Sequence, residues 1–378
     1  MYLYMGLLAV IPGIIYFTFF INRLLRTILN IHTNWFLIII IGLVIMVLSI
    51  PAMNTLELYG VIYYHLLVVM LLFELLNLGL KRFPIYRISF TTGILGIVVT
   101  ALFLGYGYYN IKHVVVTTYD LKSDKVEDLK ILEIADLHMS TSLSVTELQK
   151  YCDEMSQLNA DLVVLTGDIF DENTPLDDMV NASKALASIN NQQGIYYVYG
   201  NHDNGSHAFS DSEFGPEDVR ATLEKNGIVV LEDAVVSLDN INIIGRKDAS
   251  FWGTNPRLST SQLLEMIPEN KRGNYTIMLD HQPLNLDENA ALGIDLQLSG
   301  HTHGGQLFPM GIVQSLTSDT LIRGQRDIGD FTAITTTGIA GWRYPIKTGA
   351  PSEYVIIKYK IKEPPKLKMK SHYLRCLI

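Results

Sequence analysis

Four long apolar runs in the first 111 residues constrain the fold of this chain more than any other feature. They lie at roughly 1–21, 35–53, 61–80 and 91–111. Each has close to the ~20 residues that an α-helix needs to cross the hydrocarbon core of a bilayer. The first run lacks the cationic start and the small-residue cleavage pattern of a secretory signal, so we interpret it as a retained helix. The sequence therefore predicts four N-terminal transmembrane α-helices over residues 1–111, in a multi-pass protein of the cell membrane whose partner is the lipid bilayer.

The basic residues between these runs predict the direction in which the chain crosses the membrane. The loops after the first and third runs carry every Lys and Arg of this region, whereas the loop after the second run carries none. Cytoplasmic loops are enriched in Lys and Arg, so both basic loops are expected in the cytoplasm. Everything after residue 111 is then extracytoplasmic. The residues concerned are Arg23, Arg26, Lys81, Arg82 and Arg87.

One ionisable residue, Glu74, lies inside the third apolar run. A charged group within a membrane span is a functional candidate by default. The alternative is a structural carboxylate that pairs with polar neighbours such as Asn77, and we favour this alternative.

The rest of the chain has a different composition. The whole chain has 29 Lys and Arg against 38 Asp and Glu, and residues 1–111 hold only five and two of these, so the remainder is strongly acidic. Nucleic-acid grooves normally have a basic footprint, so no nucleic-acid partner is expected. The final segment, 362–378, is instead a basic tail that either rests on anionic headgroups or is solvated. With only Cys152 and Cys376, no structural disulfide is expected.

Hydrophobic periodicity over residues 112–361 alternates between strands and helices and then gives a series of short strands. This order predicts an α/β domain of two packed β-sheets flanked by helices. The expected strands are 113–121, 129–135, 161–167, 194–200, 229–234, 241–245, 275–281, 295–300, 331–338 and 353–360, and the expected helices are 145–159, 177–190 and 216–227.

Polar side chains come directly after five of these apolar strands. Because α/β sheets bind ligands beyond the carboxyl ends of their strands, we expect these side chains to meet at one site. The residues are Asp136 and His138, then Asp168, then Asn201 and His202, then His281, and finally His301 and His303.

The chemistry of this set points to two metal ions. Imidazoles, carboxylates and an amide oxygen suit manganese, iron or zinc better than calcium or magnesium. Seven such ligands exceed one ordinary site but suit two ions that share a carboxylate, about 3.5–4 Å apart. Such a pair generates a hydroxide that attacks phosphorus, so the predicted reaction is metal-dependent phosphoester hydrolysis.

The order D-x-H, G-D, G-N-H-D, H and G-H-T-H, over residues 131–305, resembles the calcineurin-like metallophosphoesterase superfamily. The segments "GHTHGGQLFP" and "TTGIAGWRYPIKTGAPSEYVIIKY" resemble its membrane-associated branch, which includes transmembrane proteins with a metallophosphoesterase domain. The resemblance implies two ligand sets that share Asp168 as the bridge. The first is Asp136, His138, Asp168 and His303, and the second is Asp168, Asn201, His281 and His301.

The same resemblance implies two catalytic roles. Asn201 would stabilise charge on the phosphate, and His202 would donate a proton to the departing oxygen. Asp171 and Asp203 are either partners of imidazole rings or turn residues. Many relatives have Glu where this chain has Asp203, which is not a ligand position.

Two classes of function follow from the sequence. The first is a membrane-anchored hydrolase of phosphomonoesters, phosphodiesters or pyrophosphates, acting on a phosphorylated small molecule or a lipid-linked, membrane-proximal substrate. The second is a membrane receptor or transporter that a phosphoesterase domain regulates. The spans contain few ionisable groups, which favours the anchored enzyme. Candidates to bind a distal phosphate or headgroup are Arg246, Lys247, Arg323 and Arg326.

Overall fold

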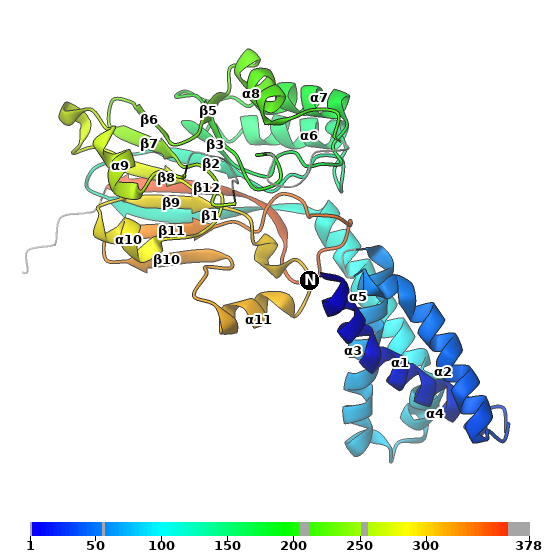
Figure 1. Ribbon diagram of the computed structural model, residues 1–378. Coiled ribbons are helices and arrows are strands. Elements are labelled where there is room, and N and C mark those ends of the chain that lie inside the picture. Colours follow the sequence, from blue (N-terminus) through cyan, green and yellow to red (C-terminus); the bar gives the residue numbers. More distant parts are fainter. Residues whose placement is uncertain (1, 55–56, 205–211, 251–255, 362–378) are drawn as a thin grey trace, which may run out of the picture.

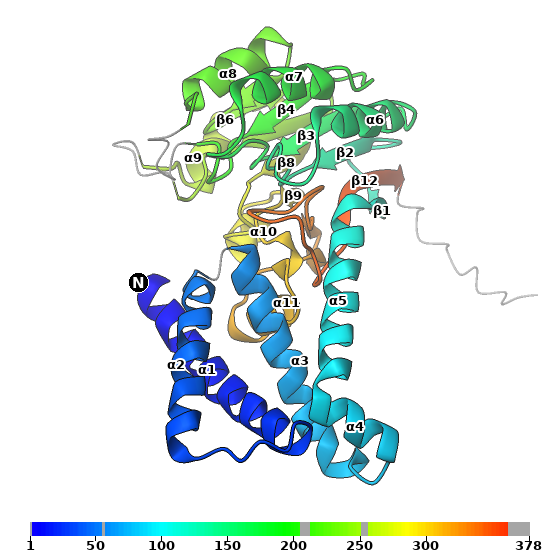
Figure 2. The ribbon, with the colours of Figure 1, turned by 90° about the vertical axis from the view of Figure 1, so that its right-hand side faces the viewer.

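The computed structural model describes residues 2–54, 57–204, 212–250 and 256–361. A bundle of helices leads through its last member directly into a two-sheet domain (Figures 1 and 2). The basic tail at 362–378 lies outside the described residues. The helices of the bundle are α1 (Tyr2–Thr27), α2 (Trp35–Ser49) with a 3₁₀ turn η1 (Ile50–Met53), α3 (Leu58–Leu80), α4 (Pro84–Thr92) and α5 (Ile94–Lys112).

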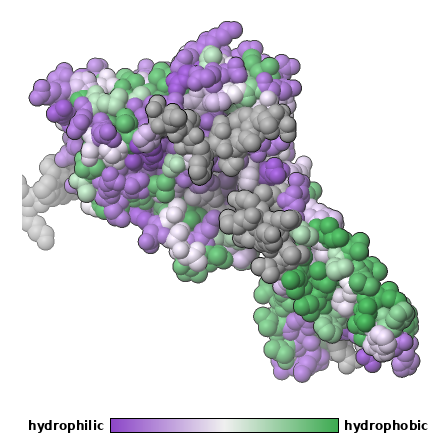
Figure 3. All heavy atoms as spheres, in the orientation of Figure 1, coloured by the Kyte–Doolittle hydropathy of each residue, from purple (hydrophilic) through white to green (hydrophobic). Residues whose placement is uncertain are grey.

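Three segments of the bundle are long and apolar enough to cross a membrane: Trp35–Met53, Leu58–Leu80 and Ile94–Lys112. The first expected span lies in α1, which is helical over 26 residues but is not among these three, so the fourth span stays a prediction. The last span also starts later than expected. Gly93 adopts a left-handed conformation, with φ 74°, that ends α4 before α5 begins. Hydrophobic residues cover much of the visible face of the bundle (Figure 3).

Glu74 of α3 is paired inside the bundle, but with partners other than the expected one. Its Oε1 accepts from Arg23 Nη1 at 2.8 Å and from the Tyr16 hydroxyl at 3.0 Å. Both partners belong to α1, and Asn77 is not one of them. The carboxylate thus joins α1 to α3, which is the structural role that we favoured.

The domain after the bundle contains two β-sheets, as the sequence predicts, and each proves to be a mixed sheet of six strands. Their strand orders are β1-β12-β2-β3-β4-β5 and β10-β11-β9-β8-β7-β6. The first sheet has β1 (Val114–Ser123), β2 (Lys130–Ile134), β3 (Leu162–Thr166), β4 (Ile195–Val198), β5 (Val229–Leu231) and β12 (Ser352–Ile361). The second has β6 (Ala234–Ser237), β7 (Ile241–Gly245), β8 (Tyr275–Leu279), β9 (Leu296–Ser299), β10 (Gly324–Ile328) and β11 (Phe331–Thr335).

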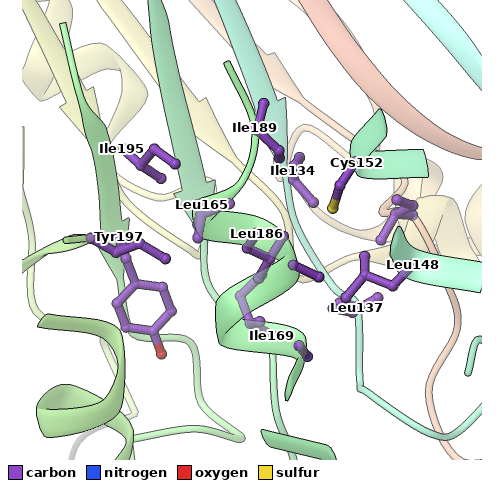
Figure 4. Packing of buried hydrophobic residues seen from close by; sticks show 14 of the residues in the cluster. Ile134, Leu137, Leu148, Cys152, Leu165, Ile169, Leu186, Ile189, Ile195 and Tyr197 are labelled. Atoms are coloured by element: carbon purple, nitrogen blue, oxygen red, sulfur yellow. The ribbon is translucent and has the colours of Figure 1, made fainter. Parts of the chain in front are cut away.

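Both faces of the central strands are buried, which explains their continuous apolar runs. Val164 of β3 packs with Ile277 of β8 between the two sheets, whereas its neighbour Leu165 points to the opposite face. Figure 4 shows Leu165 in the cluster that also contains Leu148 and Leu186. The covering helices are α6 (Val145–Ser156), α7 (Leu176–Ala187) and α8 (Pro216–Lys225) on the first sheet, and α9 (Thr260–Glu265) and α10 (Leu286–Ala291) near the second.

Some elements differ from the expected ones. The run 229–234 is not one strand, because β5 ends at Leu231 in the first sheet and β6 starts at Ala234 in the second. Asp233, with φ 48°, lies at this crossing between sheets. Strand β10 and helices α9, α10 and α11 (Met310–Thr317) were not predicted. Helices α9 and α10 have only six residues each, and the residues of β10 and α11 show neither a clear alternation nor a polar face.

Candidate metal centre

The fold brings the five polar strand ends together. Strands β2, β3 and β4 are parallel neighbours in the first sheet, and β8 and β9 are parallel neighbours in the second. Since parallel neighbours end at the same edge, the loops that follow them meet where the two sheets face each other. The amide of His138 donates to the carbonyl of Asp168 at 3.0 Å, and the amide of Gly300 donates to the carbonyl of His281 at 3.0 Å.

One group of ligand atoms comes from Asp136, His138 and His303. These atoms lie within 4.8 Å of one another, and all three residues are buried. His138 Nε2 is 3.2 Å from His303 Nε2, and His303 Nε2 is 3.7 Å from Asp136 Oδ1. Two imidazole nitrogens and a carboxylate oxygen that converge in this way can hold one cation.

A second group comes from Asp168, His281 and His301, whose ligand atoms also lie within 4.8 Å of one another. His281 Nε2 is 3.1 Å from Asp168 Oδ2 and 3.2 Å from Asn201 Oδ1. The amide oxygen of Asn201 therefore points at the same place as the three other side chains.

Asp168 lies between the two groups. Its Oδ2 is 3.1 Å from His281 Nε2 in one group and 3.7 Å from His138 Nε2 in the other. Its Oδ1 accepts from the amide of His202 at 2.8 Å, which fixes the orientation of the carboxylate. This is the position that a bridging ligand needs.

Glycine lets the backbone approach the two carboxylates closely. A Cβ at Gly200 would lie 2.1 Å from Asp168 Oδ1, and a Cβ at Gly300 would lie 2.5 Å from Asp136 Oδ2. No side chain fits at either position. The two carboxylates thus lie directly against the backbone of these glycines.

The backbone at the site is strained in the way that functional sites often are. Five residues have φ between 38° and 72°, in the left-handed region that non-glycine residues seldom adopt. Such strain persists only where the surrounding structure imposes it, and it concentrates at ligand and catalytic sites. The five are Asp136, His138, Asp168, His301 and His303.

The electrostatics of the site fit a bound cation. Burial raises the pKa of Asp136. Burial also acts to raise the pKa of Asp168, but the imidazoles of His281, His202 and His138 outweigh it and hold that pKa well below its usual value. Burial and the neighbouring His281 lower the pKa of His301 to about 4. Charges buried this deeply are normally paired or bound to metal, and the donor set suits a transition metal.

His202 lies beside the two groups with partners that the sequence did not identify. Its Nδ1 is 2.9 Å from Glu172 Oε2, and its ring centre is 5.1 Å from that of Trp342. Arg343 Nη1 lies 3.9 Å from the other oxygen of Glu172. Burial acts to lower the pKa of His202, but Asp168 and Glu172 outweigh it and raise the pKa. The only signal in the sequence was that Trp342 and Arg343 fall in the "TTGIAGWRYP" segment.

The contacts of Asp171 and Asp203 show the role of each. Asp171 Oδ2 is 3.4 Å from His138 Nδ1, and its Oδ1 accepts from the amide of Asn173 at 2.9 Å, so this residue serves both an imidazole and a turn. Asp203 instead accepts from the amides of Ile169 at 2.9 Å and Gly200 at 2.5 Å. Asp203 therefore holds two loops together, and burial raises its pKa to about 7.

The four candidate phosphate-binding cations are separated by the fold. Arg246 is buried, with Nη1 3.8 Å from Asp280 Oδ2, and Lys247 Nζ is 3.5 Å from Glu232 Oε1. Each of these two residues therefore has an acidic partner within the domain. Arg323 and Arg326 instead line a cavity next to α11.

Comparisons with known proteins agree with this geometry. Residues 129–305 match the family model described as calcineurin-like phosphoesterase. An uncharacterized metallophosphoesterase of Campylobacter jejuni is 30% identical over 274 residues, which cover 71% of this chain and 70% of that protein. The Bos taurus transmembrane protein with metallophosphoesterase domain is 25% identical over 241 residues, which cover 60% of this chain and 52% of that protein.

Among solved structures, one of a Thermus thermophilus protein aligns with a TM-score of 0.37 at 14% identity, covering 56% of this chain and 91% of that one. On the family-model match and the Campylobacter jejuni relative, the chain belongs to the calcineurin-like metallophosphoesterase family.

Proposed function

We propose that this protein is a membrane-anchored phosphohydrolase that works with two divalent metal ions. The observation that carries the proposal is the position of Asp168, whose Oδ2 contacts a histidine of each ligand group. Asp168 is the shared ligand, and manganese, iron and zinc are the metals that the donor set favours. The first ion is assigned to Asp136, His138, Asp168 and His303, and the second to Asp168, Asn201, His281 and His301.

Two bound cations would activate a water for attack on phosphorus and offset the negative charge of the phosphate. The residues of the chain supply the rest. Asn201 orients the phosphate through its amide, and Gly200 and Gly300 let the backbone lie directly against the carboxylates of Asp168 and Asp136. Glu172 accepts from Nδ1 of His202 and helps to raise the pKa of the ring, which favours the imidazolium form. Only in that form does Nε2 also carry a proton for the departing oxygen.

The substrate is assigned by class only. The acidic domain disfavours a nucleic-acid substrate. The apolar helices place the site near a membrane, so we infer a phosphorylated small molecule or a lipid-linked phosphoester, hydrolysed outside the cytoplasm. The relatives named as transmembrane proteins support the membrane anchor. The pairing of Glu74 with Arg23 inside the bundle favours an anchor over a transport path, because it accounts for the one acidic residue of α3.

The test is hydrolysis by the purified full chain in detergent. Phosphomonoesters, phosphodiesters and pyrophosphates are assayed with manganese, iron or zinc after removal of metal by a chelator. We expect turnover of at least one class that needs added metal. Asp168→Asn, which keeps the shape of the side chain, should lose both activity and bound metal. Normal turnover and two ions per chain in this variant would exclude the bridging role.

A further inference from the structure

Helix α11 and the residue pair before it form an apolar surface with no charge. Residues 304–318 contain no Asp, Glu, Lys or Arg. None of the eight residues of α11 is buried. Contiguous exposed apolar side chains on a folded protein mark an interaction site. The exposed fractions are 47% for Phe308, 47% for Met310, 53% for Ile312, 43% for Val313 and 80% for Leu316. We call these five residues the α11 surface.

The α11 surface is continuous with the helices that are apolar enough to cross a membrane. The ring of Phe308 meets the ring of Phe103, in α5, edge to face at 6.1 Å. His65 of α3 lies 5.8 Å from Phe103 and 3.4 Å from the hydroxyl of Thr348. The chain before α11 is thus fixed to the end of the bundle that faces the domain.

The views agree with these contacts. Figures 1 and 2 place α11 beside the domain-facing end of α3 and α5. Figure 3 shows hydrophobic residues at the lower edge of the domain as well as over the bundle. A bilayer that surrounds α3 and α5 would therefore meet α11 at the depth of one leaflet surface.

Behind α11 lies a cavity of about 370 Å³. Phe308 and Ile312 line its apolar side, and two cations, Arg323 and Arg326, line its polar side together with one acid, Asp319. Gly304, which also lines it, directly follows the proposed ligand His303. A lipid would suit both sides of this cavity, because its acyl chains can contact the apolar side and its phosphate can bind the two guanidinium groups.

We propose that the α11 surface inserts into the lipid leaflet next to the domain, and that the cavity behind it receives the phosphate headgroup of a lipid from that leaflet. Helices with an apolar face bind membranes in the plane of the interface, with that face buried at the boundary between headgroups and acyl chains. The inference rests on the membrane anchoring in the proposed function and does not depend on hydrolysis.

Insertion is tested with spin labels on the full chain in phosphatidylcholine vesicles. Cys376 is replaced by serine, and the buried Cys152 is shielded from the label. Labels are placed through Leu316→Cys in α11, Leu102→Cys on the exposed side of α5, and Met266→Cys after α9. Leu102 is the membrane reference, and Met266, 48% exposed, is the aqueous reference. Figure 1 places α9 far from the bundle.

The label at residue 316 should collide more with oxygen than with a water-soluble nickel complex, like the label at residue 102 and unlike the label at residue 266. If residue 316 is open to nickel like residue 266 while residue 102 is not, α11 does not insert and the inference is wrong. If residue 102 is open as well, the membrane anchoring itself fails. Dipolar broadening between labels at residue 316 of two chains would show instead that a second copy covers the α11 surface, which also overturns the inference.

Headgroup binding is tested with fluorescent phosphatidic acid in neutral detergent, a measurement that needs no turnover. The Arg323→Gln/Arg326→Gln double variant should weaken binding by about tenfold or more, the order expected for losing a charge-assisted hydrogen bond. Lys358→Met, an exposed cation on β12, is the matched control and should bind as the parent does. Equal binding by parent and double variant, or displacement by inorganic phosphate as effective as by unlabelled phosphatidic acid, would overturn the lipid site.

Discussion

The ring of His281 is oriented by the backbone carbonyl of Thr166, whose oxygen lies 2.7 Å from His281 Nδ1. Because a carbonyl can only accept, Nδ1 carries the proton and Nε2 is the nitrogen that faces Asp168. A hydrogen bond of this kind on the far nitrogen sets the tautomer and the direction of a metal-binding imidazole. Thr166 is the last residue of β3, so the strand that presents Asp168 also aims His281.

Replacing His281 should therefore remove metal before it affects the fold. We expect His281→Gln to lose about one of two bound ions and to reduce kcat/KM for every ester alike. Elemental analysis and circular dichroism measure the two effects. Gln282→Ala, one residue further along, is the control and should retain both ions. Full occupancy in His281→Gln would remove this residue from the ligand set.

His202 should behave differently from the proposed ligands. As a proton donor it matters more when the leaving group is poor, so His202→Asn should slow an alkyl phosphoester by about 10²–10⁴-fold. The loss should shrink for a nitrophenyl ester, and the metal content should stay at the parental value. The measurement is kcat/KM over esters of graded leaving-group pKa. An equal loss for all esters, or a missing ion, would place His202 among the ligands.

Glu172 is expected to act on the reaction through His202. Its carboxylate raises the pKa of that imidazole, so Glu172→Gln should lower the pKa. The protonated form would then be lost at lower pH, and the alkaline limb of the pH profile of kcat/KM should move toward acid. Glu172→Asp is the conservative variant and should partly restore the limb. A uniform loss of activity with an unmoved profile would show a structural role only.

Lys347 supports the loop next to Asp136. We expect it to make the free energy of unfolding depend on pH. Its buried Nζ donates to the carbonyls of Thr337, Gly338 and Ala340 at 2.5, 3.1 and 3.0 Å. Lys347→Met leaves these carbonyls unsatisfied and should cost about 1–3 kcal/mol of stability. Lys358→Met on the exposed side of β12 is the control, and thermal unfolding in detergent is the measurement.

The sign of the pH effect follows from the burial of Lys347, which lowers its pKa to about 7. Between about pH 7 and about pH 10 the unfolded chain keeps this proton and the folded chain has lost it. The unfolded state then binds more protons, so this group makes stability rise with pH across the window. Below pH 7 both states are protonated and the slope disappears. The parent should show the slope relative to Lys347→Met, and identical slopes would contradict the shifted pKa.

The orientation of the chain is tested with reporters at both ends. A periplasm-active enzyme fused after Ile378 should be active, because the basic loops are predicted to lie in the cytoplasm. A cytoplasmic signal from this fusion would reverse the orientation. A second fusion before Met1 decides the span count. It should report outside if α1 crosses the membrane, as in the four-span prediction, and inside if only the three spans from Trp35 onward do.

The sequence by itself determined the features that depend on local pattern. Apolar runs predicted the membrane region, and alternation with flanking Gly predicted most strands. Polar residues such as Asp136 and His138 come directly after an apolar run, so the sequence around them was enough to place them at the end of a strand. Parallel neighbours must end at one edge, and this topological rule turned five separate strand ends into one predicted site.

Only the tertiary structure decided which residues meet across the chain. Glu172 reaches His202 because the loops after β3 and β4 lie together, and Arg23 reaches Glu74 because α1 packs on α3. Neither pair has a sequence spacing that signals contact. The sequence also did not predict that Leu316 is exposed, because an apolar residue in a helix is expected to be buried unless its surroundings are known. Such contacts follow from how sheets and helices pack, and that packing is set by the summed burial of many side chains rather than by any one motif.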